Sequence, residues 1–214
     1  MQPMQRARSE TAKLAREDAI LTSAEILLRQ LGYDAMTMQA VATAAGLAKG
    51  TLYLYFTSRE SLVLAVHGRL FDRWIDRFAV YQPELNGFDG FCRDFAWHYA
   101  DDPLFLQLAG FAIALLEPKL DRKAYIKNKR DMARRVKRLA GLVCQRFSIA
   151  PVAAQKLIWG FLTIAFGTAQ MTVCSPVAKA DLPHDVVAFN GMANFETVFV
   201  NAAAPLGVNL IPSQ

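Results

Sequence analysis

A short run of polar and aromatic residues, from Lys49 to Tyr55, carries the side chains best suited to contact another macromolecule. Lys49 supplies a point charge for a phosphate, and Thr51 supplies a hydroxyl. Gly50 would let a backbone N–H come close to a nucleic acid, while Tyr53 and Tyr55 offer hydroxyls for phosphates and rings for sugars or thymine methyl groups. These residue types indicate a surface that binds double-stranded DNA.

Two short helices joined by a tight turn are expected to hold this surface. Four apolar residues recur at helical spacing and can share one small core, namely Val41, Ala45, Leu52 and Phe56. Ala42 lacks bulk, so a second helix can cross close to it. Gly46 follows the first helix, where a left-handed conformation costs a glycine nothing sterically. We therefore predict a helix-turn-helix over about residues 38–57, with the second helix in a major groove. An ordinary helical corner with exposed tyrosines is the alternative.

The run from Gly46 to Phe56, GLAKGTLYLYF, is followed by the pentapeptide SRESL and preceded by GYDAMT at residues 32–37. Together these segments resemble the signature of the TetR (tetracycline-repressor) family of bacterial transcriptional regulators over about residues 14–64. The resemblance implies an all-α homodimer. Three N-terminal helices would form the helix-turn-helix domain that binds a DNA operator. A larger C-terminal helical domain would bind a small effector and form the dimer.

The family pattern also implies which residues contact DNA. They are Thr37, Lys49, Gly50, Thr51, Tyr53, Tyr55 and Arg59. Thr37 would contact a phosphate from the start of the second helix, and Arg59 stands where the family usually has a phosphate-binding lysine. Two positions differ from the usual pattern. Ala48 replaces a common serine, which removes one possible hydrogen bond to DNA. Leu54 is apolar at a variable position that can touch bases.

Breaker residues divide the rest of the chain into helices, and no stretch shows the alternation typical of a strand. We expect about nine helices, over approximately residues 14–31, 38–45, 49–56, 58–81, 88–100, 103–116, 121–147, 152–173 and 184–203. Thr57 and Glu60 fit a capping box at the start of the fourth helix, and Ser58 is the alternative cap. The predicted buried face of the first helix consists of Ile20, Ala24, Leu27 and Leu31, widened by Leu21 and Leu28.

These helices are expected to form two domains. Residues 14–64 would be the DNA-binding domain, and residues 65–214 would be the effector-binding and dimerisation domain. Residues 1–13 are expected to form a flexible arm. The arm is basic and could reach DNA, or it could simply fray. No pattern of a secretory leader precedes the first helix, so we expect a cytoplasmic protein.

The charge of the chain is concentrated outside the helix-turn-helix. The whole chain carries +5, but residues 119–146 alone carry eleven lysines and arginines against two aspartates, or +9. This basic helix could contact nucleic acid or anionic lipid, or it could be a solvated face that aids solubility. We favour the solvated face.

Aromatic residues are concentrated in the middle of the chain and suit either a packed core or a pocket for a small apolar or aromatic effector. The candidate pocket residues are Phe91, Phe95, His98, Phe105, Phe111, Trp159 and Phe166, in a region that also holds Trp97, Tyr99 and Phe161. Residues 157–178 carry no charged side chain, which suits a membrane span or a helix buried on nearly all sides, and we favour the buried helix. By the family pattern, the dimer-interface candidates are Trp159, Ile164, Phe166, Phe195, Val198 and Phe199.

The sequence shows no signature of an enzyme or a metal protein. It contains no Gly-rich phosphate loop, zinc-ligand spacing or nucleophile elbow, and we expect no cofactor. Cys92, Cys144 and Cys174 are far apart and suit reduced core residues. The predicted function is a ligand-responsive DNA-binding regulator without a membrane segment. Two alternatives remain, namely a DNA-binding dimer without an effector and a helical small-molecule-binding or catalytic protein that no longer binds DNA.

Overall fold

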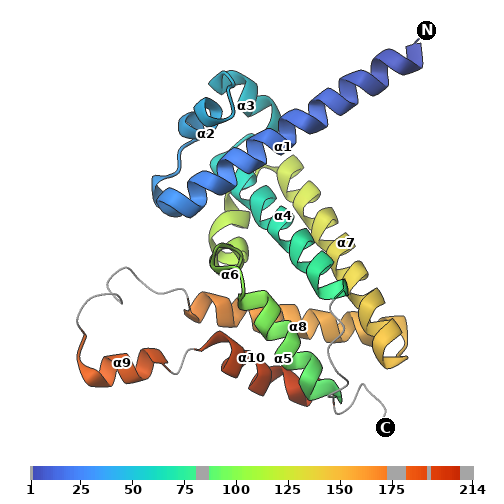
Figure 1. The fold of residues 1–214 in the computed structure, drawn as a ribbon, viewed down its shortest axis with the longest axis vertical. Coiled ribbons are helices and arrows are strands. Elements are labelled where there is room, and N and C mark those ends of the chain that lie inside the picture. Colours follow the sequence, from blue (N-terminus) through green and yellow to red (C-terminus); the bar gives the residue numbers. More distant parts are fainter. Residues whose placement is uncertain (1, 81–86, 173–181, 192–193, 208–214) are drawn as a thin grey trace. The chain divides into compact units, whose positions relative to one another are not determined.

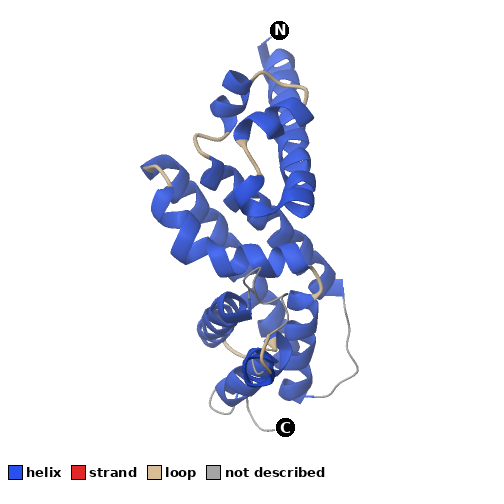
Figure 2. Ribbon diagram, turned by 90° about the vertical axis from the view of Figure 1, so that its left-hand side faces the viewer, coloured by secondary structure: helices blue, strands red, loops and turns tan. Residues whose placement is uncertain are grey.

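The computed structural model describes residues 2–80, 87–172, 182–191 and 194–207; side chains are described from residue 11 onwards, except at residues 189–191. Within these ranges the chain is helical and contains no strand, which confirms the all-α prediction (Figures 1 and 2). The α-helices are α1 (Gln2–Ala35), α2 (Met38–Ala44), α3 (Lys49–Tyr55), α4 (Arg59–Val80), α5 (Gly87–Ala100), α6 (Pro103–Phe111), α7 (Arg122–Phe147), α8 (Pro151–Thr172), α9 (His184–Gly191) and α10 (Phe195–Ala203). A π-helical segment, Ala112–Leu116, extends α6, and short 3-10 turns occupy Glu117–Lys119 and Ala204–Gly207.

The chain forms two compact units. The first contains Met1–Val66 together with Leu116–Asn128, and the second contains His67–Leu115 together with Lys129–Gln214. The first unit therefore holds the predicted helix-turn-helix and also the start of α7. No sequence pattern had connected that segment with the N-terminal helices.

Helix α1 differs from the prediction at both ends. It is helical from Gln2, although a loose arm was expected over residues 1–13. The buried positions are Ile20, Ala24 and Leu28, at a spacing of four, whereas Leu31 is 50% exposed. The buried face therefore runs along Ile20, Ala24 and Leu28, and the assignment of Leu31 to it was wrong. Gly32 interrupts the helical geometry with a φ of 77°, as expected for the end of the regular helix.

The cap of α4 also differs from the expected capping box. Ser58 and Ser61 exchange two hydrogen bonds, from the N–H of each residue to the hydroxyl of the other, at 3.1 and 3.0 Å. Thr57 instead donates its hydroxyl to Asp121, and Glu60 accepts a hydrogen bond from Tyr33. The reciprocal cap is thus built by two serines, which confirms the alternative cap at Ser58. The predicted capping box of Thr57 and Glu60 was wrong, because both residues have other partners.

A dense aromatic core occupies the second unit, where α10 packs against α5 and α8, and α8 packs against α6 (Figure 1). A Cβ at Gly110 of α6 would lie 3.1 Å from the backbone of Gln170, so the α6 and α8 backbones approach closely. Ring centroids of Phe95 and Phe199 lie 5.0 Å apart, and those of Tyr99 and Phe195 lie 5.4 Å apart, both stacked. This core ties α10 to α5.

The last helix expected from the sequence is two helices. Helix α9 ends at Gly191, and α10 begins after Asn194, whose side chain accepts a hydrogen bond from the N–H of Thr197 at 3.0 Å. An N-cap of this kind starts a new helix. The described part of the chain therefore has ten α-helices where about nine were expected.

Helix α8 passes a test of length and composition for a membrane span, as does the bent pair formed by Gly87–Ala100 and Pro103–Lys119. One face of α8 is buried against α6 and α10 of the same unit, which is the environment of a core helix. The opposite face is exposed along a helical stripe, Val152, Lys156, Trp159, Thr163, Gly167 and Gln170. We had expected this helix to be buried on nearly all sides. Within one chain it is buried on one face only.

The basic helix α7 uses several of its charges in ion pairs. Arg135 and Arg138 pair with Asp72 and Asp76 of α4 in the second unit, and Lys127 lies 3.8 Å from Glu17 in the first. Part of the excess positive charge therefore joins helices to one another.

Candidate DNA-binding surface

A glycine turn connects α2 to α3. The N–H of Leu47 donates to the carbonyl of Ala42 at 2.9 Å, and the N–H of Gly46 donates to that of Thr43 at 3.1 Å. Gly46 has a φ of 66°. These two bonds and the left-handed glycine form a Schellman motif, which satisfies the last carbonyls of α2 and redirects the chain. The turn that the sequence predicted at Gly46 is confirmed.

The apolar side chains of the two helices pack as the spacing predicted, with one exception. Val41 and Ala42 of α2 are fully buried, as is Leu52 of α3, and Phe56 is 5% exposed. Ala45 is only half-buried. Burial of Leu52 and Phe56 fixes the rotation of α3 about its own axis, and therefore fixes which residues face outward.

The outward face of α3 carries the predicted contact residues. Lys49 and Gly50 are exposed, Tyr53 is 42% exposed, and Thr51 and Tyr55 are half-buried. Leu54 is 84% exposed. Lys49 is the only charged residue between residues 37 and 56. The face thus combines one cation, hydroxyls and an apolar tip, the mixture that phosphate and base-edge contacts use.

Nothing in the described part of the chain requires a glycine at position 50. A Cβ built at this position meets nothing within 4 Å, and the residue lies inside helix α3. Glycine is costly in a helix unless a close approach demands it. Any close approach here must come from outside the described part of the chain.

Thr37 caps α2, as predicted. Its hydroxyl accepts the N–H of Ala40 at 3.1 Å, and the residue is exposed. This bond uses only a lone pair of the hydroxyl, so its hydrogen can be donated to a phosphate oxygen. One residue can therefore cap the helix and contact DNA.

Arg59 is held by its own chain. Its guanidinium lies 4.3 Å from the ring centroid of Tyr33 and donates to the carbonyls of Tyr33 and Asp34, each at 3.4 Å. Burial raises the pKa of Tyr33, and the nearby Arg59 opposes that shift. These contacts fasten the start of α4 to the end of α1, so Arg59 is better placed to position the unit than to bind a phosphate freely.

Asp121 is a functional candidate that the sequence analysis assigned only to a helix boundary. It caps α7 by accepting the N–H of Ala124 at 2.8 Å, and it also accepts the hydroxyl of Thr57. The bond from Thr57 holds the pKa of Asp121 below its ordinary value. This carboxylate joins the junction of α3 and α4 to the start of α7. Pairing across 64 residues leaves no local sequence signal.

The predicted effector-pocket residues are only partly together. Phe91, Phe95 and Phe105 are buried in the aromatic core. His98 is also buried, and its ring lies 6.1 Å from that of Phe78. Trp159 is 57% exposed on the outer stripe of α8 and does not belong with them.

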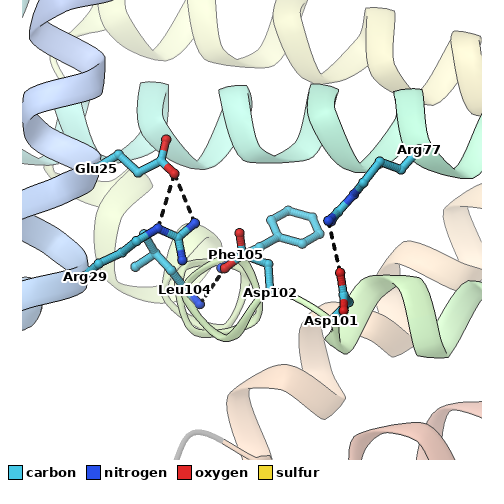
Figure 3. A network of polar contacts seen from close by, with 7 residues as sticks. All are labelled: Glu25, Arg29, Arg77, Asp101, Asp102, Leu104 and Phe105. Atoms are coloured by element: carbon cyan, nitrogen blue, oxygen red, sulfur yellow. Dashed lines mark hydrogen bonds and ion pairs between the residues drawn. The ribbon is translucent and has the colours of Figure 1, made fainter.

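Two half-buried pocket candidates remain, Phe111 and Phe166. Phe166 lies 6.3 Å from His67, a buried residue that no sequence pattern singles out. The start of α6 near Phe105 is fixed by Asp102, whose carboxylate accepts the N–H groups of Leu104 and Phe105 (Figure 3).

The predicted dimer-interface residues divide into two groups. Phe195 and Phe199 are 5% and 0% exposed in the aromatic core of their own chain, so they are not available to a second subunit. Their assignment to an interface was wrong. Trp159 is exposed, and Ile164, Phe166 and Val198 are half-buried.

Two family models match the chain in succession. The model described as "Bacterial regulatory proteins, tetR family" matches residues 20–66, and the model described as "Tetracyclin repressor-like, C-terminal domain" matches residues 68–204. The chain belongs to the TetR family. Its residues 20–66 therefore form the helix-turn-helix region of this family of bacterial regulatory proteins.

This TetR-family protein is similar to its curated relatives over only part of their length. The transcriptional regulator AlkX of Mycobacterium tuberculosis is 31% identical over 109 residues, which cover 47% of this chain and 50% of AlkX. The repressor KstR of Mycolicibacterium smegmatis is 40% identical over 62 residues, or 29% of this chain and 30% of KstR. The matches thus span half or less of these relatives.

Solved structures resemble the TetR-family fold of this chain over almost its whole length. A TetR-family structure from a Rhodococcus species has a TM-score of 0.56 and 19% identity and covers 89% of this chain and 97% of its own. The multidrug binding protein EbrR, solved with ethidium, has a TM-score of 0.53 and 17% identity and covers 92% and 99%. At these identities the likeness establishes the fold.

Proposed function

We propose that this TetR-family regulator is a ligand-responsive repressor that binds a palindromic operator as a homodimer in the cytoplasm. The outward face of α3 carries the proposal. Burial of Leu52 and Phe56 turns Lys49, Gly50 and Tyr53 outward together. In a dimer, two such helices would enter successive major grooves about 34–36 Å apart.

The proposed DNA contacts divide by chemistry. Lys49 and Thr37 contact phosphates, which position the protein without reading sequence. Gly50 allows the backbone of α3 to approach, while Thr51, Tyr53 and Tyr55 contact phosphates, sugars and base edges. Leu54 reaches a thymine methyl group, the apolar feature of a T·A pair in the major groove. Arg59 holds the start of α4 against the end of α1.

The exposed stripe of α8 is the proposed dimer surface. It contains Trp159 and the open position Gly167, where a Cβ would meet nothing within 4 Å. A large aromatic anchor and a small residue on the same stripe allow two helices to pack closely. Half-buried Ile164 and Val198 extend this surface, whereas the interior phenylalanines of α10 do not.

A small, mostly apolar effector is proposed to bind among the aromatic side chains of the second unit and to release the operator. Support comes from the number of buried rings and from the fold shared with EbrR, which was solved with ethidium. The effector can shift DNA binding only by its differential affinity for the two states. A DNA-binding dimer without an effector is the alternative.

The test uses the full-length protein and the DNA upstream of its own gene. Footprinting is expected to show protection of an inverted repeat, and compounds that raise the melting temperature are expected to reduce that protection. A ligand at 100 times its dissociation constant adds about 2.7 kcal/mol of stability. If no site in this DNA is protected, the result contradicts the proposed binding to a palindromic operator. Protection that no stabilising compound relieves favours the alternative.

A further inference from the structure

Among the buried side-chain atoms that have no hydrogen-bond partner in the described residues, three lie around one aromatic ring deep in the second unit. They are His67 Nε2, Trp74 Nε1 and the hydroxyl of Tyr99. His67 is 2% exposed, and Trp74 and Tyr99 are fully buried. Buried polar atoms are nearly always paired, because an unpaired one loses its bonds to water without replacement. Three in one small region require an explanation.

The three groups surround the ring of Phe105. Its centroid lies 5.4 Å from that of His67, 4.7 Å from that of Tyr99 and 6.3 Å from that of Trp74. Figure 3 shows the Phe105 ring extending from α6 toward α4, the helix that carries His67 and Trp74. Phe71 lies against His67, Trp74 and Phe105 as well. The orphaned polar atoms therefore lie in one aromatic cluster.

The hydrogen-bonding capacity of the cluster is specific. The indole of Trp74 only donates, and the hydroxyl of Tyr99 donates and accepts. Burial, with a smaller effect from nearby Arg135, lowers the pKa of His67 to about 3, so its imidazole is neutral. Arg135 itself is paired with Asp72. None of the three polar side chains is ionised at neutral pH, so a charged ligand would lose its hydration without a counter-charge from them.

We propose that His67, Trp74 and Tyr99 form the polar part of the effector site and select an uncharged, mostly apolar ligand that carries a carbonyl or hydroxyl oxygen. This inference rests on the proposed effector response. The ligand's hydrocarbon part replaces contacts between rings, and its oxygen accepts from Trp74 or Tyr99. A buried water bonded to the same groups is the competing occupant, and the first test below distinguishes the two. Half-buried Phe166, beside His67, is the ring that moves to admit the ligand.

The first test needs no ligand. Tyr99→Phe removes an unpaired hydroxyl and keeps the ring, so the variant is expected to melt at the same temperature as the wild type or higher. Tyr125→Phe on α7, an exposed tyrosine, is the control. A clear fall in melting temperature for Tyr99→Phe alone shows that the hydroxyl is already bonded in the free protein, and this overturns the proposal.

The second test compares three probes of similar shape by calorimetry with the full-length protein. They are benzophenone, which carries a carbonyl, diphenylmethane, which lacks it, and the anion 4-benzoylbenzoate. Benzophenone is expected to bind at least about fivefold more tightly than either of the others, the value of one hydrogen bond. Tyr99→Phe, which keeps the ring, is expected to remove most of that preference while leaving the affinity for diphenylmethane unaffected.

Trp97→Phe is the matched control, because Trp97 lies on α5 but is 53% exposed. It should change the affinity for none of the probes. Equal affinity for ketone and hydrocarbon, a preference for the anion, or no binding of any probe overturns the proposed ligand class. Operator binding is measured on the same preparations. If the protein binds DNA but does not distinguish the probes, only the proposed effector site is rejected. If it distinguishes the probes but does not bind DNA, only the proposed regulator function is rejected.

Discussion

Arg135 of α7 forms a bidentate ion pair with Asp72 of α4, with Nε 2.8 Å from Oδ1 and Nη2 2.7 Å from Oδ2. The guanidinium passes directly over Gly68, where a Cβ would lie 2.7 Å from Nη2. Two-point pairing of this kind is geometrically demanding. Gly68 therefore leaves room for the ion pair, and the pair accounts for one of the basic residues of α7.

Gly68→Ala is expected to destabilise the protein by about 1 kcal/mol, because the new methyl group displaces Arg135 from a partly exposed pair. In an Asp72→Asn background the same substitution should be neutral or stabilising, since alanine favours a helix over glycine. Urea unfolding of the four proteins in this cycle measures the coupling. Equal destabilisation in both backgrounds would show that Gly68 is needed for another reason.

His67 should make stability depend on pH. Unfolded, it binds a proton near pH 6.5; folded, its pKa of about 3 keeps it neutral. The unfolded state therefore binds more protons between these values, so stability falls as pH falls from about 6.5 toward 3. The loss at pH 5 is about 2 kcal/mol. His67→Leu should flatten this part of the pH profile in urea unfolding. An unchanged profile would mean that other groups produce it.

Gly50→Ala separates stability from DNA binding. The variant should be more stable by up to about 1 kcal/mol, because nothing in the described structure opposes a Cβ there. It should bind the operator about tenfold more weakly, a loss of 1.4 kcal/mol, because the methyl group meets DNA. Gly141→Ala, at another open helical glycine on α7, should gain stability and keep full affinity. Fluorescence anisotropy with labelled DNA gives both affinities.

If α8 forms the dimer interface, glutamate substitutions at Gly167 and at Gly141 should affect the oligomeric state differently, although neither site is crowded. Gly167→Glu places a charge on the exposed stripe of α8 and should shift the protein from dimer to monomer at micromolar concentration. Gly141→Glu on α7 should leave the dimer intact. Light scattering at several concentrations distinguishes them. If both variants are dimeric, or if both are monomeric, the result contradicts the assignment of α8 to the dimer interface.

Local chemistry explains what the sequence predicted well. The turn at Gly46, the N-cap at Thr37 and the burial of Leu52 and Phe56 all depend on residues a few positions apart, so spacing and residue type suffice.

Errors arose where a distant residue decided the outcome. Thr57 leaves the expected capping box because Asp121 accepts its hydroxyl. Phe199 is interior because it stacks on Phe95, and spacing alone cannot distinguish that position from an interface. His67 gave no signal, because its surroundings come from α4, α6 and α8.

Ion pairs near the surface contribute less than their number implies. The Arg77–Asp101 pair, drawn in Figure 3, has a separation of 3.0 Å, but both side chains are nearly half exposed. Such pairs are typically worth about 0–1 kcal/mol. The buried ring cluster, and not these charges, is therefore expected to supply most of the stability of the second unit.

The most direct test of the account measures the operator affinity of Tyr53→Ala against Tyr125→Ala. The two tyrosines are 42% and 44% exposed, so their loss should affect stability similarly. Anisotropy titration with the protected upstream DNA should show a loss of about tenfold or more for Tyr53→Ala and none for Tyr125→Ala. Wild-type affinity in a folded Tyr53→Ala protein would contradict the assignment of α3 as the DNA-reading helix.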